Sequence, residues 1–174
     1  MASEVTICNQ ALSWLAATPI LTINDGTTNA NLCLANYAEL RDATLESAAW
    51  TFATERYQWA PLAAPNVPAY GYANKFLIPS TILRVLECRE DPSQPDGISN
   101  IDWRREGQHI VTDAGVIYAK CIIQVTAVNN TSALFRQALA ARIAGTLAPT
   151  ITESKGLADR MWNLYEQYIK LILL

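Results

Sequence analysis

Two carboxylates, Asp102 and Glu106, are the residues whose types and spacing most resemble a catalytic pair. Both belong to a segment that its β-branched and aromatic residues predict to be a strand, and their even separation places them on one face of it. Glycosidases use two carboxyl groups about 5 to 10 Å apart in a cleft. The pair makes polysaccharide cleavage one candidate function, although solvated charges at a sheet edge are the commoner cause of such a pattern.

The other residues that could support chemistry form no recognisable site. His109 is the only histidine, and a lone histidine within a predicted strand is more often structural than a general base. Cys8, Cys33, Cys88 and Cys121 lie far apart without the paired spacing of a zinc site, so we expect free, buried thiols in a reducing compartment. Glycine-rich phosphate loops, GxSxG and HExxH are missing. We therefore predict a protein that is not an enzyme and has no catalytic residue, cofactor or metal.

The composition predicts a folded chain that does not hold nucleic acid tightly. With 174 residues, 51% apolar and 17% charged, it has the length and the apolar content of a single domain, residues 1–174. The charged fraction is below the roughly 25% of an average chain, which favours apolar surface reserved for a partner. The net charge of −3 gives no strong positive field, and Arg104 and Arg105 beside Trp103 are flanked by acids, as expected of ion-pair or interface residues.

Nothing in the sequence predicts association with a membrane. The first residues, MASEVTICNQ, carry an acid and lack the basic region that precedes the apolar run of a secretory signal. The longest apolar stretches are well short of the roughly 18 residues that a membrane span requires.

The elements that must position these residues are grouped along the chain. Apolar residues at helical spacing predict helices at about 3–18, 27–52, 133–148 and 154–172, the third of them stopped by Pro149. Between them, short alternating segments separated by Gly, Pro, Asp and Asn predict a central, mostly antiparallel sheet over about 53–126. Two helices, a sheet and two further helices indicate an α+β fold and argue against a doubly wound nucleotide-binding fold.

The last predicted helix is more apolar than one contact surface requires. At 100° per residue, its apolar residues form two stripes about 100° apart. One stripe contains Leu157, Met161, Leu164, Tyr168 and Leu171, and the other contains Trp162, Tyr165, Ile169 and Ile172. One stripe is enough to pack the helix on its own domain, and the second either packs in a groove of the same chain or binds elsewhere.

The terminal sequence favours the second alternative. The chain ends Leu171-Ile172-Leu173-Leu174, where ends are normally polar and frayed. Burying four such side chains is worth roughly 6 to 12 kcal/mol before ordering costs, at about 1.5 to 3 kcal/mol each. We therefore predict that a tail of about residues 162–174 inserts into an apolar groove of a partner, as in helix-in-groove recognition. The residues assigned to this docking role are Trp162, Tyr165, Ile169, Ile172, Leu173 and Leu174.

Four segments in order resemble a known family. RDATLESAAWTFATERYQW contains an Arg followed, after a helical stretch, by Trp, an aromatic with Ala, and a further Arg; here these are Arg41, Trp50, Phe52-Ala53 and Arg56. CNQALSWLAATPILTIND precedes it, an aromatic run with LIPSTILRVLEC follows, and RIAGTLAPTITES comes last. Together these segments resemble phage head-to-tail adaptor proteins of the tail tubular A type, found in short-tailed phages. The loop 91–99 matches no part of that pattern.

The resemblance implies a structural role in the virion. Such adaptors form a ring, usually of twelve copies, beneath the portal protein, where they lengthen the DNA channel and offer a docking surface to the tail nozzle protein. It therefore implies assembly in the host cytoplasm and a final place in the tail or neck of the virion, with DNA passing through the lumen without specific binding. The apolar C-terminal tail would anchor the chain in the portal. Two alternatives to the connector stay open. One is a polysaccharide-cleaving tail component that uses Asp102 and Glu106, and the other is a cytoplasmic assembly factor absent from the finished particle.

Overall fold

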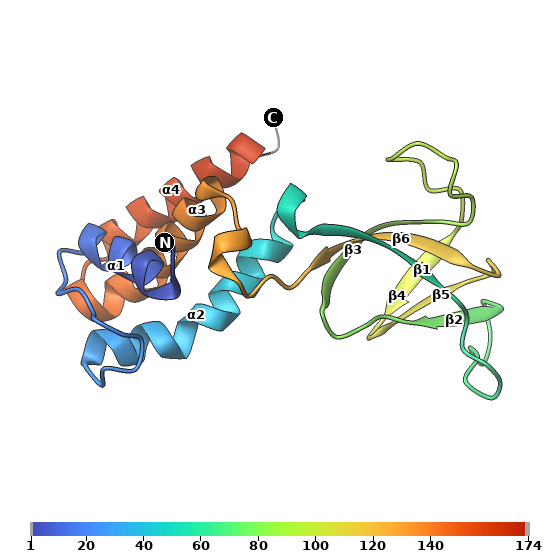
Figure 1. The fold of residues 1–174 in the computed structure, drawn as a ribbon, viewed down its shortest axis with the longest axis horizontal. Helices are drawn as coiled ribbons and strands as arrows, with labels where there is room; N and C mark the ends of the chain where they lie inside the picture. The colour runs from blue at the N-terminus through green and yellow to red at the C-terminus, as the bar shows by residue number, and fades with distance from the viewer. Residues whose placement is uncertain (1, 173–174) are drawn as a thin grey trace. The chain divides into compact units, whose positions relative to one another are not determined.

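The computed structural model describes residues 2–172, and the fold is α+β, as predicted. The chain divides into two compact units, a helical unit that takes the sequence up to Phe52 and again from Val125, and a sheet unit from Ala53 to Gln124. Figure 1 shows the four helices in one unit and the six strands in the other. The sequence predicts one domain, and the structure has two compact units within it. The chain enters the sheet unit once, after Phe52, and returns to the helical unit once, after Gln124.

Helix α3 (Ala133–Thr152) is the centre of the helical unit. It packs against α1 (Glu4–Trp14), α2 (Thr28–Glu46) and α4 (Lys155–Ile172). Hydroxyl N-caps begin all four of these helices, because the side chains of Ser3, Thr27, Ser132 and Ser154 each accept a hydrogen bond from a backbone N–H of the first turn. Large apolar side chains alternate on α3 with small ones, and nearly all of them are buried.

The first two helices end earlier than the sequence predicts. α1 stops at Trp14, before Thr18-Pro19, because Ala16 adopts φ 53° and the N–H groups of Ala16 and Ala17 bond back to the carbonyls of Ser13 and Leu12. This is the hydrogen-bond pattern of a Schellman cap. α2 ends at Glu46, and a short 3₁₀ turn, η1 (Thr51–Ala53), leads into the first strand.

The third helix ends later than predicted. α3 continues through Pro149 to Thr152 and closes at Glu153, whose φ of 54° is left-handed. A proline within a helix removes one backbone donor, the one that would bond to the carbonyl four residues earlier. Pro149 lies only three residues before the end of α3, so the last turn still forms around it.

The sheet unit contains two antiparallel sheets where the sequence predicts one. The first has the order β1 (Thr54–Trp59), β6 (Ile117–Ile123) and β3 (Ile82–Arg89). The second has the order β2 (Asn74–Leu77), β5 (His109–Thr112) and β4 (Trp103–Glu106). A shared core of buried side chains joins them, among them Phe76, Val85, Ile110 and Ile117.

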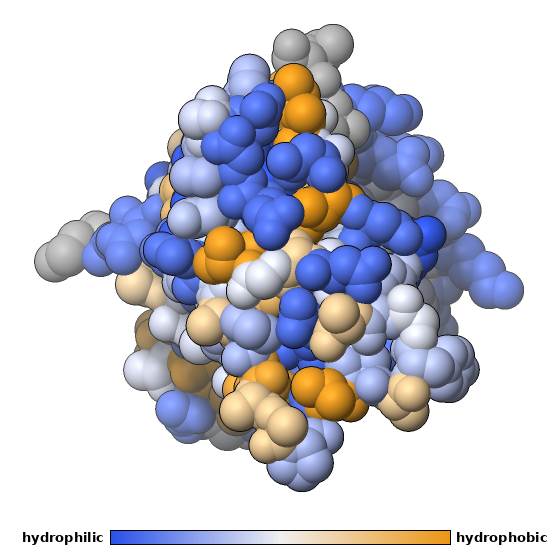
Figure 2. Space-filling view, turned by 90° about the vertical axis from the view of Figure 1, so that its right-hand side faces the viewer, coloured by the Kyte–Doolittle hydropathy of each residue, from blue (hydrophilic) through white to orange (hydrophobic). Residues whose placement is uncertain are grey.

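The face of the sheet unit seen in Figure 2 is mostly hydrophilic. Figure 2 looks onto the end of this unit and shows apolar side chains as separate spots between hydrophilic ones. The 14-residue connection between β1 and β2 carries the most exposed aromatic side chain of the described residues, Tyr70.

None of the helices in residues 2–172 is both long enough and apolar enough to cross a membrane.

Candidate functional site

The strands β1, β6 and β3 carry a two-row grid of polar side chains on one face. Antiparallel pairing places Arg56 opposite Lys120 and Lys120 beside Glu87, which forms the first row. Two residues further along the strands, Gln58 lies opposite Tyr118, and Tyr118 pairs with Arg89. Because side chains alternate between the faces of a strand, residues between these positions point to the apolar core instead.

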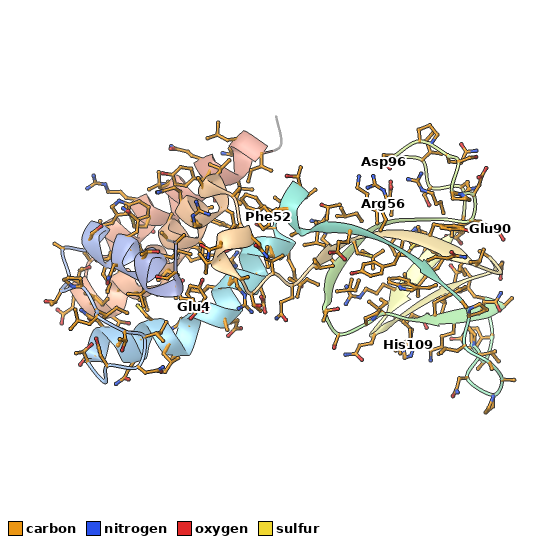
Figure 3. All side chains as sticks on the ribbon, viewed as in Figure 1. Glu4, Phe52, Arg56, Glu90, Asp96 and His109 are labelled. Atoms are coloured by element: carbon orange, nitrogen blue, oxygen red, sulfur yellow. The ribbon has the colours of Figure 1, made fainter. Side chains whose placement is uncertain are left out.

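A carboxylate from the loop between β3 and β4 completes this grid. Asp96 Oδ2 lies 2.7 Å from Nη2 of Arg56 and 2.8 Å from Nζ of Lys120, and its Oδ1 lies 3.5 Å from Nη2 of Arg89. Figure 3 shows the side chains of Arg56 and Asp96 directed toward each other. The pKa of Asp96 is held below its usual value, chiefly because the Lys120 ammonium donates a hydrogen bond to it, so Asp96 is ionised at neutral pH.

A second, more buried ion pair lies beneath Asp96. The guanidinium of Arg89 pairs with Glu87 and donates a hydrogen bond to the carbonyl of Gln94, and both charged side chains are largely shielded from water. The second oxygen of Glu87 accepts a hydrogen bond from the N–H of Gly97 at 2.8 Å. This bond holds the loop on the sheet through its backbone, in addition to the ion pairs of Asp96. Gly97 has φ +85°, a conformation that favours glycine.

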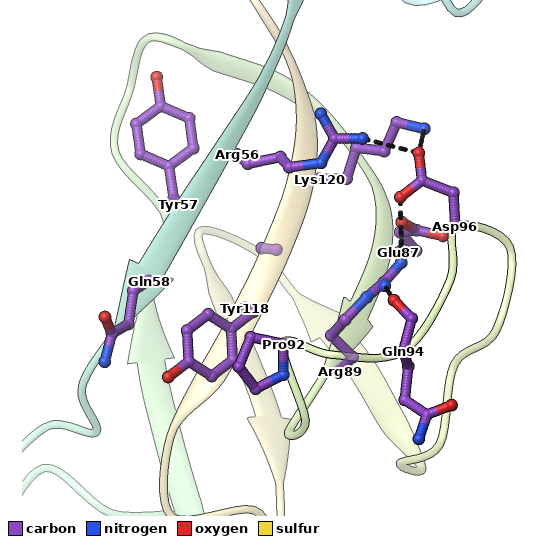
Figure 4. A pocket seen from close by; sticks show the side chains of 11 residues that line it. Arg56, Tyr57, Gln58, Glu87, Arg89, Pro92, Gln94, Asp96, Tyr118 and Lys120 are labelled. Atoms are coloured by element: carbon purple, nitrogen blue, oxygen red, sulfur yellow. Dashed lines mark hydrogen bonds and ion pairs between the residues drawn. The ribbon is translucent and has the colours of Figure 1, made fainter.

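These side chains surround an open cavity of about 340 Å³. Figure 4 shows the ion pairs of Asp96 and the remaining lining residues, which include Gln58, Pro92 and Tyr118. Three cations and two carboxylates line it, and both carboxylates are engaged in ion pairs. Because both carboxylates are paired with cations, the arrangement suits binding of acceptor groups better than acid catalysis.

Only one residue of this cavity was singled out from the sequence. Arg56 belongs to the adaptor-like signature, while Asp96, Lys120 and Arg89 were not predicted as site residues. The alternation of the apolar Ile117, Ala119 and Cys121 with Lys120 is one local signal, because it places Lys120 on the polar face of its strand. Asp96 lies in the loop that matches no family pattern. Its partners Arg56 and Lys120 are 40 and 24 residues away in the sequence, so no short sequence pattern predicts these contacts.

The other signature residues are structural parts of the helical unit. Trp50 is buried, donates from Nε1 to the carbonyl of Thr44 at 2.9 Å, and packs edge-on against Phe135, with ring centroids 5.0 Å apart. Phe52 contacts the same Phe135 ring at 5.3 Å. Arg41 is buried on α2 and pairs with Asp42 at 2.8 Å. Trp50 and Phe52 thus fix the segment after α2 to the start of α3, whereas Arg41 pairs with its neighbour on α2. Arg56 belongs to the sheet unit.

Part of the predicted docking stripe on α4 packs against α3 of the same chain. Tyr165 is only 8% exposed, and its hydroxyl accepts a hydrogen bond from Nη1 of Arg142 at 2.9 Å. The Arg142 guanidinium also lies over the rings of Tyr165 and Trp162, at 5.2 and 6.0 Å from their centroids. The prediction that Tyr165 is presented to a partner is therefore wrong, because α3 already buries it.

The rest of the two stripes is only partly covered. Trp162 is 37% exposed, and Ile169 and Ile172 are half-buried; Leu173 and Leu174 lie outside the described residues. In the other stripe, the side chains of Leu157, Met161, Leu164 and Tyr168 are half-buried, and that of Leu171 is 58% exposed. The alternative that this helix packs in a groove of its own chain thus holds for its middle, and apolar surface remains at its end.

The carboxylate pair expected of a glycosidase does not form a site. Asp102, directly before β4, accepts a hydrogen bond from the Tyr72 hydroxyl at 3.1 Å and pairs with Arg104 at 2.9 Å. Glu106 lies four residues further along the chain, opposite His109. At about 3.3 Å per extended residue, its Cα is about 13 Å from that of Asp102. Neither carboxylate lines the cavity on β1, β6 and β3.

The cysteines are free and buried, as predicted. Burial raises the pKa of both Cys88 and Cys121 to about 12. The pKa of Cys8 is also raised, chiefly by its hydrogen bond with Cys33. Among residues 2–172, no group of three or more His, Cys, Asp or Glu side chains is arranged to hold a metal ion.

No protein-family model and no curated protein matches this chain.

Proposed function

We propose that this chain is a structural head-to-tail connector subunit of a short-tailed phage. The observation that carries the proposal is the ordered resemblance of four sequence segments to the tail tubular A type of adaptor. The packing of the signature supports it, since Trp50 and Phe52 meet on one ring, that of Phe135 in the first turn of α3.

The chemistry of the described surface also supports a structural role. The carboxylates of the cavity are held by cations, and Asp102 and Glu106 do not line that cavity. The chain carries a net charge of −3, so DNA would pass through a lumen made of it without being held.

In this proposal the exposed end of α4 is the portal-binding segment. Leu171 and the half-buried Ile169 and Ile172 offer the apolar surface, and Leu173 and Leu174 extend it along the sequence. Trp162 contributes only the part of its ring that remains exposed, since the ring also packs on Gly145 of α3. The remaining partners are the tail nozzle protein and neighbouring copies in a ring of about twelve, joined by heterologous contacts that close by rotation. Such a ring would be assembled in the host cytoplasm and kept in the neck of the virion.

Mass spectrometry of purified phage particles tests this proposal against an assembly factor. A connector subunit should be present in the particle at a fixed ratio to the portal protein, near one copy each. Its absence from finished particles, with abundant chain in the infected-cell lysate, would refute the connector role.

A further inference from the structure

We propose that the cavity on β1, β6 and β3 is a binding site for a ligand with an oxyanion group, a carboxylate or a phosphate, carried on a small ring or chain. The proposal concerns the sheet unit alone and does not depend on the connector role. It rests on the convergence of cations, on unused donors and on the size of the cavity.

The cations of the site already recognise one oxyanion. Arg56 and Lys120 come from neighbouring strands and contact the same oxygen of Asp96, while Arg89 approaches the other oxygen. Charge-assisted hydrogen bonds from Arg and Lys are the usual means of holding carboxylate and phosphate groups. The geometry that holds Asp96 is therefore a geometry suited to an external group of the same chemistry.

The site has more donors than its own acceptors use. Arg56 contacts Asp96 through one nitrogen of a guanidinium that carries five N–H donors, and Lys120 contacts it through one of three. In the described chain the Gln58 amide and the Tyr118 hydroxyl, both at the cavity wall, have no hydrogen-bond partner in the protein. A ligand rich in acceptors would use these donors.

The cavity has two zones of different character. The row formed by Arg56 and Lys120 is cationic, and the neighbouring row offers the flat surface of Tyr118 together with Pro92 and the neutral Gln58 (Figure 4). The volume of about 340 Å³ is within the range of about 300 to 1,000 Å³ that small-molecule sites occupy. A ligand would thus place its oxyanion on the first row and its neutral part on the second.

Asp96 is an internal competitor in this arrangement. Its carboxylate neutralises the same cations that would bind the ligand, and its depressed pKa keeps it charged at neutral pH. A neutral side chain at this position should therefore strengthen binding, whereas loss of Arg56 or Lys120 should weaken it. A network that serves only to fasten the loop predicts no such opposite signs.

The test is a titration of the full chain with inorganic phosphate, D-glucuronate and neutral glucose at constant ionic strength, followed by backbone amide NMR. We expect phosphate, glucuronate or both to shift the amides of Gly97 and Lys120 saturably, and glucose to leave them unchanged. Binding of only one anion still supports the site and identifies its ligand class. No saturable response to either anion, or an equal response to glucose, would overturn the proposal.

Variants locate the binding and supply its control. Arg56→Gln and Lys120→Gln should each weaken anion binding up to about fivefold, and Asp96→Asn should strengthen it by about twofold to fivefold. Arg104→Gln is the matched control, since Arg104 and Arg56 are each 65% exposed and each pairs with an aspartate, but Arg104 lies on the other sheet. Equal weakening by Arg104→Gln would mean that only general surface charge is sensed. Unchanged binding in Asp96→Asn would mean that Asp96 does not compete with the ligand for Arg56 and Lys120. Either result would reject the site.

Discussion

Trp162 of α4 lies directly on Gly145 of α3. A Cβ placed on Gly145 would be 3.1 to 3.2 Å from atoms of the indole ring, closer than side chains normally approach. The small residues of α3 thus have a specific function, since they let the most bulky side chain of α4 reach the helix backbone. This contact decides which face of α4 is turned inward and which is left for a partner.

Replacing Gly145 should loosen α4. In Gly145→Val the new side chain overlaps the indole of Trp162, and such overpacking costs typically about 1 to 3 kcal/mol. Denaturant unfolding should reveal a loss of this size. Gly156→Val is the matched control, because a Cβ on Gly156 of the same helix pair meets nothing within 4 Å. Equal losses in the two variants would indicate a general cost of valine in a helix and would rule out the contact as the cause.

The hydroxyl of Tyr165 should stabilise the fold through Arg142. Nε of Arg142 is buried and, among the described atoms, is without a hydrogen-bond partner, so the bond from Nη1 to Tyr165 is important for this guanidinium. Tyr165→Phe keeps the ring and removes the acceptor, and we expect a loss of about 1 to 2 kcal/mol in the free energy of unfolding. Tyr168→Phe on the same helix, at a half-buried position, should cost much less. Indistinguishable unfolding curves for Tyr165→Phe and wild type would contradict this role.

The exposed end of α4 should be required for portal binding and not for folding. Leu171→Glu places a charge on a side chain that is 58% exposed, so stability should change little. If the portal buries this leucine, affinity should fall by at least about tenfold, corresponding to about 1.5 to 3 kcal/mol for a buried leucine. Leu77→Glu, at a leucine 51% exposed on β2, should leave portal binding unchanged. If surface plasmon resonance gave Leu171→Glu and Leu77→Glu the same affinity for the portal, Leu171 would not be part of the interface.

The buried thiols predict how stability depends on alkaline pH. Cys88 and Cys121 have pKa values raised to about 12 in the folded chain because they are buried, whereas thiols in the unfolded chain ionise near 9.0. The unfolded state therefore loses these protons first, and stability should be fully present below about pH 9 and fall as the pH rises toward 12. The Cys88→Ala, Cys121→Ala double variant should show a shallower fall in denaturant unfolding followed against pH. A slope identical to that of wild type would show that other groups govern the decline.

Local patterns predict the elements of this protein well and their assembly less well. The alternation of Ile117, Ala119 and Cys121 with Lys120 was enough to assign both faces of β6, because strand periodicity depends only on neighbouring residues. The end of α2 was placed six residues too late, at 52 instead of Glu46, since no proline or glycine marks the change from helix to the turn that Trp50 holds.

The candidate site depended on contacts that sequence periodicity does not encode. Asp96 meets Lys120 only after the loop between β3 and β4 has folded back over the sheet, a long-range event fixed in part by Gly97 and Glu87. The inward position of Tyr165 was missed for a related reason. The spacing of a helix gives its two apolar stripes, but the choice between them is made by Gly145 and Arg142 on another helix.

The most direct test of the connector role is the mass of the purified chain alone and after addition of the portal protein, measured by native mass spectrometry. We expect small species for the chain alone and, with portal present, a single large closed complex that contains a ring of this chain. Loss of that complex on deletion of residues 171–174, with the truncated chain still folded, would identify the docking segment. A chain that keeps its own mass in the presence of excess portal would contradict the account.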